Sequence, residues 1–359
     1  MKRLLITLFA ALFALPLAAE VAPEHLVRLA ESFRMAEVLG PRVWPGFTAA
    51  DSPVILIDGK SEYLLNSRER PEGFTATDQT FRGRIVYFRP SVFPPSLQAS
   101  FPAIGRPAVV IGTPEGTSTE PPVWTIVVLH ELFHVYTFTH GEIEKVASLA
   151  IGPSDDGRWQ LTYPFPYTDA RVRRAMHVAG HALYGCIGSG ADLPYEADVA
   201  DEAVRTFGDL VDASFPGTKD RSYMKFVITK EGVARYFEYR IADLAARDYK
   251  PTAAYVELEG ANAFTRAWDS YYKAMPFQIK HLGNVSQSRN EFYNLGMGIA
   301  LVLDRIEPEW QKKYFDAGVW LDDLLHEAAQ GVKAANACPI TGRSQREDPG
   351  VASSRPLIN

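Results

Sequence analysis

The clearest chemical pattern in the sequence is the segment His130-Glu131-Leu132-Phe133-His134, which has the spacing HExxH. On a helix, residues four apart lie one turn apart on the same face, so both imidazoles can reach one cation. Imidazole suits Zn²⁺, and a zinc site with three protein ligands keeps a position open for water. The pattern therefore predicts a site for one Zn²⁺, with His130 and His134 as ligands and Glu131 beside them.

The first candidate for a third ligand is His140. It follows the histidine pair at the spacing of the metzincin pattern HExxHxxGxxH, but Thr137 stands where that pattern has its helix-breaking glycine, and Gly141 comes only after His140. If the helix continues to Gly141, His140 lies about 9 Å beyond His134 along the axis, because each residue rises about 1.5 Å. We therefore expect His140 at the end of the helix and keep it as the alternative ligand.

The second candidate is Glu231, in the segment KEGVARYFE that covers residues 230–238. Glu231, Arg235 and Glu238 fall at i, i+4 and i+7, which makes a polar stripe on an otherwise apolar helix. Such a stripe faces a solvent-filled cleft or bulk solvent. Glu231 is therefore either a metal ligand or the partner of Arg235 in a surface ion pair, which would stabilise the helix by only a few tenths of a kcal/mol. Gly232 weakens a helix by about 1 kcal/mol, which favours a site of close helix approach.

Two further motifs carry a resemblance to known enzymes. The EGxxxYxE pattern that begins at Glu231 resembles the third-ligand helix of gluzincin metallopeptidases, such as the aminopeptidase N and glycyl aminopeptidase families, in which this glutamate binds zinc. The segment from Tyr293 to Gly296 is similar to their YxxG helix, whose tyrosine hydroxyl helps to hold the oxyanion. The resemblance rests on three short motifs and their order, and it implies Glu231 as third ligand and Tyr293 as oxyanion donor.

These patterns predict a zinc metallopeptidase that hydrolyses peptide bonds through a zinc-activated water. Glu131 is the expected general base, and Glu238 either orients a ligand or pairs with Arg235. One alternative is a metzincin-like peptidase that uses His140; another is a catalytically silent zinc or peptide-binding protein of the cell envelope. Glu131 favours the enzyme, because a structural zinc has no use for an uncoordinated carboxylate. The upstream GxMEN segment of the aminopeptidases is missing, so aminopeptidase specificity is not implied.

A second histidine pair, His177 and His181, has the same four-residue spacing in an expected helix. It lacks an adjacent glutamate, so we interpret it as lining a cleft or supporting packing rather than binding metal. The segment 112–116 links the last expected strand to the metal helix and should lie at the edge of the cleft. An edge strand there could pair with an extended peptide.

The remaining patterns predict an α+β fold with a small β-containing lobe, residues 20–118, before a larger helical catalytic lobe, residues 119–340. The resemblance to gluzincins implies that this fold is zincin-like. Alternating or continuous apolar runs bounded by Gly and Pro indicate the strands, and 3.6-residue periodicity indicates the helices. The expected strands are 53–58, 84–88 and 107–111, and the expected helices are 23–39, 120–140, 168–186, 196–213, 221–247, 258–274, 289–305 and 319–334.

The first 19 residues resemble a secretory signal, since a positive start precedes an apolar run and two alanines. We therefore expect a periplasmic or secreted protein without stable membrane insertion. In such a compartment Cys186 and Cys338 either pair as a disulfide or stay buried as thiols, and their spacing does not decide between the two. Residues 341–359 are expected to be a flexible tail. The net charge of −6 argues against a nucleic-acid partner. The metallopeptidase motifs imply a peptide or protein as the substrate.

Overall fold

The structure is a computed structural model that describes residues 20–147, 149, 151, 159–188, 192–284, 286, 288–316 and 318–337. The expected signal segment (residues 1–19), Cys338 and the expected tail (residues 341–359) lie outside these residues. The signal and the tail therefore stay predictions, and the two alternatives for Cys186 and Cys338 stay open. Within the described part, no helix is both long enough and apolar enough to span a bilayer.

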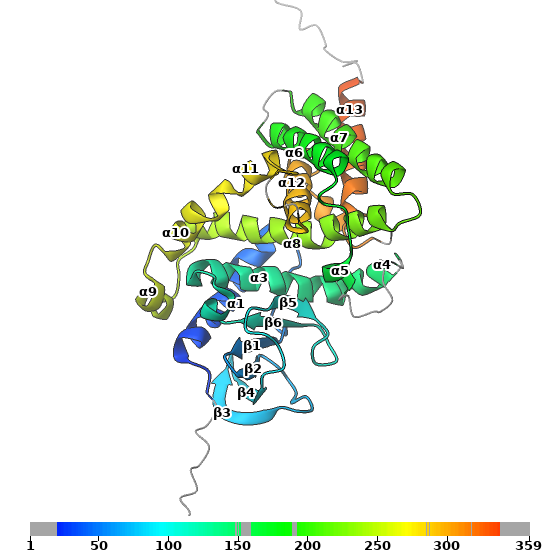
Figure 1. Ribbon diagram of the computed structural model, residues 1–359. Helices are drawn as coiled ribbons and strands as arrows, with labels where there is room; N and C mark the ends of the chain where they lie inside the picture. The colour runs from blue at the N-terminus through cyan, green and yellow to red at the C-terminus, as the bar shows by residue number, and fades with distance from the viewer. Residues whose placement is uncertain are drawn as a thin grey trace, which may run out of the picture.

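One six-stranded mixed sheet forms the N-terminal part of the molecule, at the bottom of Figure 1. The strands lie in the order β3-β4-β2-β1-β6-β5; β1 and β6 are parallel, and all other neighbours are antiparallel. Strand β5 is therefore an edge strand next to β6. The strands are β1 (Val54–Asp58), β2 (Ser61–Leu65), β3 (Thr75–Phe81), β4 (Arg84–Pro90), β5 (Gln98–Phe101) and β6 (Ala108–Gly112).

The central strand β1 buries both of its faces, because successive side chains point to opposite sides of a strand. Val54 and Leu56 join the main core, whereas Ile55 and Ile57 join a smaller core on the other face. Phe93 and Phe101, among other side chains of residues 93–104, pack against this smaller core. The segment that leads into β5 thus covers the outer face of the sheet.

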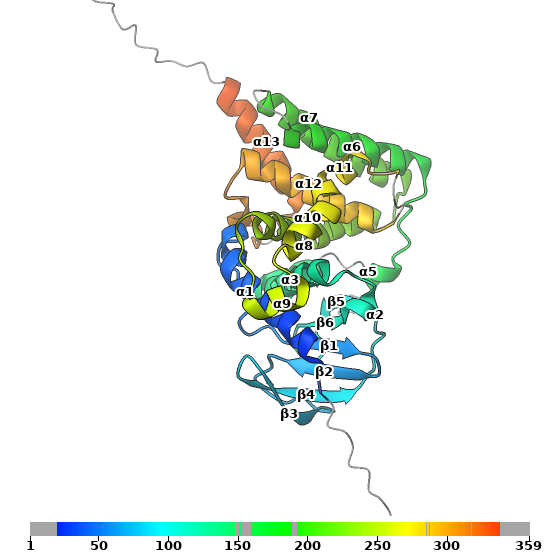
Figure 2. The ribbon, with the colours of Figure 1, turned by 90° about the vertical axis from the view of Figure 1, so that its left-hand side faces the viewer.

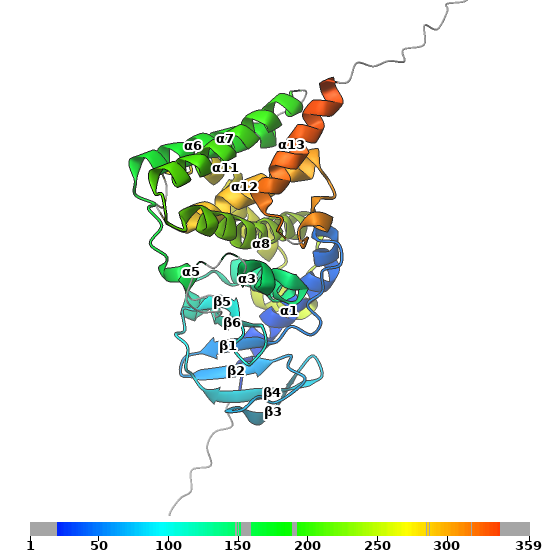
Figure 3. The same cartoon turned by 90° about the vertical axis from the view of Figure 1, so that its right-hand side faces the viewer.

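Most of the remaining described residues are helical, and most of these helices lie above the sheet in Figures 1 and 2. Helix α3 lies between the sheet and α8, with α1 beside it, and α12, α6, α7 and α13 stack above α8; Figure 3 shows the same order. This confirms the α+β class. The helices are α1 (Pro23–Val43), α2 (Pro114–Thr117), α3 (Pro121–Thr137), η1 (Phe138–Glu142), α4 (Ile143–Ala147), α5 (Trp159–Thr162), α6 (Ala170–Gly188), α7 (Leu193–Ser214), α8 (Asp220–Asp248), α9 (Ala253–Glu259), α10 (Ala263–Ser270), η2 (Tyr272–Ala274), α11 (Met275–Lys280), α12 (Asn290–Ile306), η3 (Trp310–Lys313) and α13 (Leu321–Ala337).

One predicted helix is wrong. Residues 258–274 were expected as a single helix, but the chain forms the end of α9, then α10, then the short η2. Gly260 follows α9 with φ of 85°, in the left-handed region that glycine adopts readily, and this ends the helix. The three predicted strands correspond to β1, β4 and β6, whereas β2, β3 and β5 were not expected from the sequence.

Helix α3 is fixed firmly on both sides. Its Trp124 donates a hydrogen bond from Nε1 to the carbonyl of Gly112 at 2.8 Å, which ties the start of the helix to the end of β6. Farther along, the ring of Phe133 packs between Trp44, at 4.9 Å, and Phe237 of α8, at 4.6 Å. Aromatic pairs at these distances add about 0.5–1.5 kcal/mol each beyond the area they bury. The sheet and α8 are thus both anchored to α3.

Candidate metal centre

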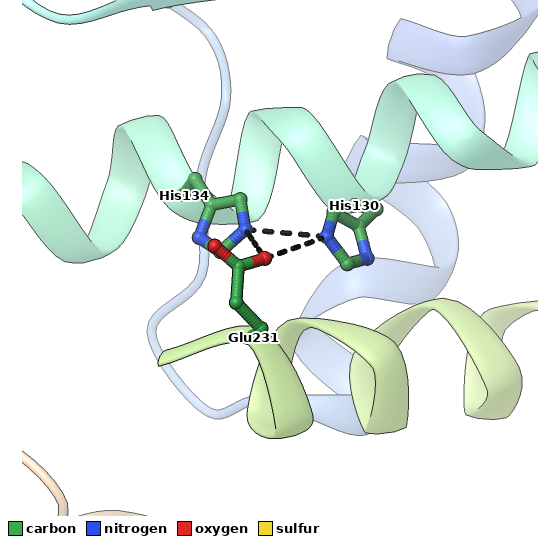
Figure 4. Close-up of side chains that lie close together, drawn as sticks. All are labelled: His130, His134 and Glu231. Carbon is green, nitrogen blue, oxygen red and sulfur yellow. Dashed lines mark hydrogen bonds and ion pairs between the residues drawn. The ribbon is translucent and has the colours of Figure 1, made fainter. Parts of the chain in front are cut away.

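The HExxH segment lies in the interior of α3 and presents its two histidines to α8, as predicted. The Nε2 atoms of His130 and His134 are 3.2 Å apart, and the side chains project from successive turns of the helix (Figure 4). Both residues are buried, with exposed fractions of 5% and 2%. Two nitrogen ligands are therefore aimed at one point that is shielded from bulk water.

Glu231 of α8 completes the group from the opposite side (Figure 4). Its Oε2 lies 3.1 Å from Nε2 of His134 and 3.7 Å from Nε2 of His130. One ligand atom from each residue lies within 4.8 Å of the others, and this is the only such group of three or more among the described residues. The structure thus contains a buried triad that could bind a metal ion.

Two glycines allow α8 to pass this close. A Cβ on Gly232 would lie 2.4 Å from Cα of Gly296 in α12, and a Cβ on Gly296 would lie 2.1 Å from the carbonyl oxygen of Ile228. Both distances are far below van der Waals contact, so only glycine fits at this crossing. The glycine of the EG motif and the glycine of the YxxG motif therefore meet, which brings Glu231 and Tyr293 to one place.

Two cations hold the second carboxylate oxygen of Glu231. Arg289 donates from Nη2 to Oε1 at 2.6 Å, and Lys230 donates from Nζ to the same atom at 3.2 Å. Burial opposes ionisation of Glu231, but the charges of Lys230 and Arg289 outweigh it and hold the pKa of this carboxyl well below its usual range. Glu231 is thus a permanent anion whose Oε2 faces the histidines, and it is no surface partner of Arg235.

Glu238 orients the first histidine. Its Oε2 accepts a hydrogen bond from Nδ1 of His130 at 3.0 Å, and its Oε1 accepts one from the hydroxyl of Tyr272 at 2.9 Å. Arg235 lies 3.2 Å from the same carboxylate, so Glu238 both orients a histidine and pairs with arginine. With the proton of His130 on Nδ1, the lone pair of Nε2 faces the triad, as a metal ligand requires.

The pKa values of the two histidines differ because their neighbours differ. Burial lowers the pKa of His130, but Glu231 and Glu238 outweigh it and raise the pKa to about 9. Burial, reinforced by the charge of Lys230, lowers the pKa of His134 to about 3. A metal ion can bind only when Nε2 of each histidine is unprotonated. Because the ion also adds positive charge beside two carboxylates, it would replace the proton on Nε2 of His130 and leave the proton on Nδ1. The donor set therefore fits a divalent cation.

Glu131 lies beside the triad but is not part of it. The hydroxyl oxygen of Ser100 in β5 lies 2.8 Å from Oε2 of Glu131 and 2.8 Å from its main-chain carbonyl oxygen, so its single proton is shared between these two acceptors. Burial raises the pKa of this carboxyl, and the nearby charge of Glu231 adds to the effect. The edge strand thus positions a buried carboxylate with raised basicity next to the candidate ligands.

Tyr293 of α12 lies on the other side of His130. The two rings are stacked, with centroids 6.1 Å apart and an angle of 8° between their planes. The guanidinium groups of Arg235 and Arg289 lie 5.5 Å and 5.3 Å from the tyrosine ring. Burial, together with the charge of Glu231, raises the pKa of the hydroxyl well above its usual value, so Tyr293 keeps its proton and can donate it in a hydrogen bond.

A cleft passes over the triad in two arms. The polar arm, a cavity of about 540 Å³, is lined by His130 and by Ser118, Thr119, Glu120, Ser270 and Asn290. The apolar arm, a cavity of about 820 Å³, is lined by His134 and by Val92, Phe93, Pro94, Leu97, Phe101 and Leu161. Gln98, Glu131 and Tyr293 border both arms. The triad therefore lies between two cavities, each large enough for part of an elongated ligand.

His140 lies apart from the triad. Helix α3 ends at Thr137, a π-helical turn follows, and His140 has the non-helical backbone angles φ −121° and ψ 31°. Its side chain is exposed and its Nδ1 lies 2.7 Å from the carbonyl oxygen of Tyr136. The arrangement of ligands required by the metzincin alternative is therefore not formed.

Four residues of the site were missed from the sequence: Ser100, Lys230, Arg289 and Tyr272. Arg289 precedes Tyr293 by one helical turn and Lys230 adjoins Glu231, so a search for cations next to the motif residues finds both. Ser100 and Tyr272 carry no such signal, because each reaches its partner only through the tertiary fold.

Comparison of the chain with models of protein families, with curated proteins and with solved structures gave no match.

Proposed function

We propose that this protein is an exported, zinc-dependent metallopeptidase of the gluzincin type, with His130, His134 and Glu231 as ligands. Zinc bound there would supply a Lewis acid that lowers the pKa of a coordinated water to about 7. Two imidazoles and one carboxylate are a common ligand set of catalytic zinc in peptidases. Export rests on the signal-like pattern of the first 19 residues.

The observation that carries the proposal is the uncoordinated carboxylate of Glu131. It is buried, it borders both arms of the cleft, and Ser100 fixes one of its oxygens. In peptide hydrolysis Glu131 would accept a proton from the attacking water and pass it to the leaving amine. A purely structural metal site would not need this group, so its placement supports catalysis over the silent metal-binding alternative.

Tyr293 and the edge strand complete the proposed machinery. The hydroxyl of Tyr293 would donate a hydrogen bond to the developing oxyanion, a contact worth about 10²–10³ in rate in comparable sites. Strand β5 borders the cleft and has β6 as its neighbour on one side, so its other side could pair with an extended substrate. A polypeptide is therefore the substrate that this site suits best.

The test compares two carboxylate variants of the full chain. Glu131→Gln should retain one metal ion per chain and lose hydrolysis of a peptide mixture by at least about 10², because the base is gone while all three ligands remain. Glu72→Gln is the control, since Glu72 is exposed and lines neither arm of the cleft. It should cleave like the parent protein, and a chelator should inactivate both the control and the parent. A folded, metal-loaded parent that cleaves no peptide would leave the silent metal-binding protein as the better account.

A further inference from the structure

The two arms of the cleft differ in chemistry, and this difference points to a class of substrate. We propose that the protein cleaves polypeptides after a bulky apolar residue, whose side chain occupies the apolar arm. This inference rests on the proposed peptidase function and adds to it the identity and the side of the recognised residue.

The first argument is the lining of the apolar arm. Val92 and Leu161 border it with 67% and 66% of their surfaces exposed, and Phe93, Pro94, Leu97 and Phe101 supply the rest of the apolar wall. Contiguous exposed apolar surface in a concave site is a common mark of ligand binding. The polar arm also contains Val123, Val127 and Tyr271, but most of its other lining residues carry hydroxyl, amide or carboxylate groups. An apolar side chain would therefore gain more from the apolar arm than from the polar one.

The second argument is that this wall is held in place. Glu62 of β2 is fully buried and accepts hydrogen bonds from the main-chain N–H groups of Val92, at 2.7 Å, and Phe93, at 2.8 Å. Arg89 donates from Nε to the other oxygen of Glu62 at 2.6 Å, and its guanidinium lies 5.7 Å from the ring of Phe93. A prearranged wall loses little conformational entropy on binding. Glu62 is thus a positioning residue for the apolar arm.

The third argument concerns direction. Gln98, at the start of β5, borders both arms, whereas Phe101, at its end, borders only the apolar arm. Antiparallel strand pairs outnumber parallel pairs about two- to threefold. A peptide antiparallel to β5 would enter with its amino-terminal part beside Phe101 and leave with its carboxyl-terminal part in the polar arm. The apolar arm would then hold residues on the amino-terminal side of the cleaved bond.

The experiment digests a mixed peptide library with the parent protein and maps the cleaved bonds by mass spectrometry, with Glu131→Gln as the blank. We expect Phe, Leu, Met or Tyr to be enriched before the cleaved bond. A peptide with such a residue should be cleaved with a kcat/KM at least about tenfold higher than its alanine counterpart. Cleavage without this enrichment, or with enrichment only after the cleaved bond, would overturn the inference. The absence of any cleavage would instead overturn the proposed function.

A variant pair tests whether the apolar arm causes the preference. Leu161→Asn should reduce the ratio of kcat/KM between the two peptides severalfold; Leu161 is exposed, so the fold should tolerate the change. Val178→Asn is the matched control, because Val178 is also an exposed apolar residue, 53% accessible, but lies on α6 outside both arms. An unchanged ratio in Leu161→Asn would contradict the assignment.

Discussion

Two histidine pairs in this molecule have nearly the same local geometry but different surroundings. The rings of His130 and His134 are 4.8 Å apart at 80°, and those of His177 and His181 are 4.5 Å apart at 70°. The first pair is buried and meets a carboxylate from α8, whereas the second lies at the surface of α6, where Lys280 is a charged neighbour of His181. Four-residue spacing thus places two imidazoles together, but the opposing helix decides whether they form a candidate metal centre.

The largest effect should follow from removal of the opposing carboxylate. Glu231→Ala should weaken metal binding by more than about a hundredfold, since loss of groups that only orient a ligand already costs 10–100-fold. Competition with a chromogenic chelator would measure the change, with circular dichroism as a check on folding. His140→Ala should bind metal like the parent. Retention of metal by Glu231→Ala together with its loss in His140→Ala would restore the metzincin-like arrangement.

The next effect concerns the helix crossing that brings Glu231 to the histidines. Gly232→Ala should lower the free energy of unfolding by about 1–3 kcal/mol, because the added methyl would meet main-chain atoms of Gly296 at 2.4 Å. Gly331→Ala adds the same methyl to α13 where no atom lies within 4 Å, and it should raise the stability by up to about 1 kcal/mol. Denaturant unfolding would measure both, and equal effects would show that the close crossing is not required.

The smallest effect concerns the second pair. Burial lowers the pKa of His181 from its usual value, and the charges of His177 and Lys280 lower it further. Lys280→Ala removes one of these charges, so protonation becomes easier and the pKa should rise towards 6.5. An NMR titration of the histidine ring protons would follow it, with Lys273→Ala as a control because Lys273 is paired with Asp269. An unchanged pKa would contradict this assignment, because it would show that the charge of Lys280 has no effect on His181.

Local patterns identified the three residues of the candidate triad because each motif lies within a single helix. Residues 130–134 and 231–238 have helical spacing, so the face that each presents follows from the 3.6-residue period. Gly232 signalled a close approach, and the structure identifies Gly296 as its counterpart. These features are encoded within a few residues of one another and can be recognised without knowledge of the fold.

Features that depend on non-local pairing were missed. Strand β5 has the sequence Gln-Ala-Ser-Phe, which lacks β-branched residues and becomes a strand only beside β6. Strand β3 exposes most of its side chains, so it has little apolar alternation to detect. For the same reason neither Ser100 as the partner of Glu131 nor Glu62 as a buried anchor could be found. The two arms of the cleft therefore emerged only from the structure.

We expect the metal ion to bind to the pair His130 and His134 and not to the pair His177 and His181. Zinc content per chain, measured by inductively coupled plasma mass spectrometry on purified protein, tests it directly. The parent and the double variant His177→Ala/His181→Ala should each carry one zinc, and His130→Ala/His134→Ala should carry none. One zinc in His130→Ala/His134→Ala, together with none in His177→Ala/His181→Ala, would show that the second pair binds the metal ion instead.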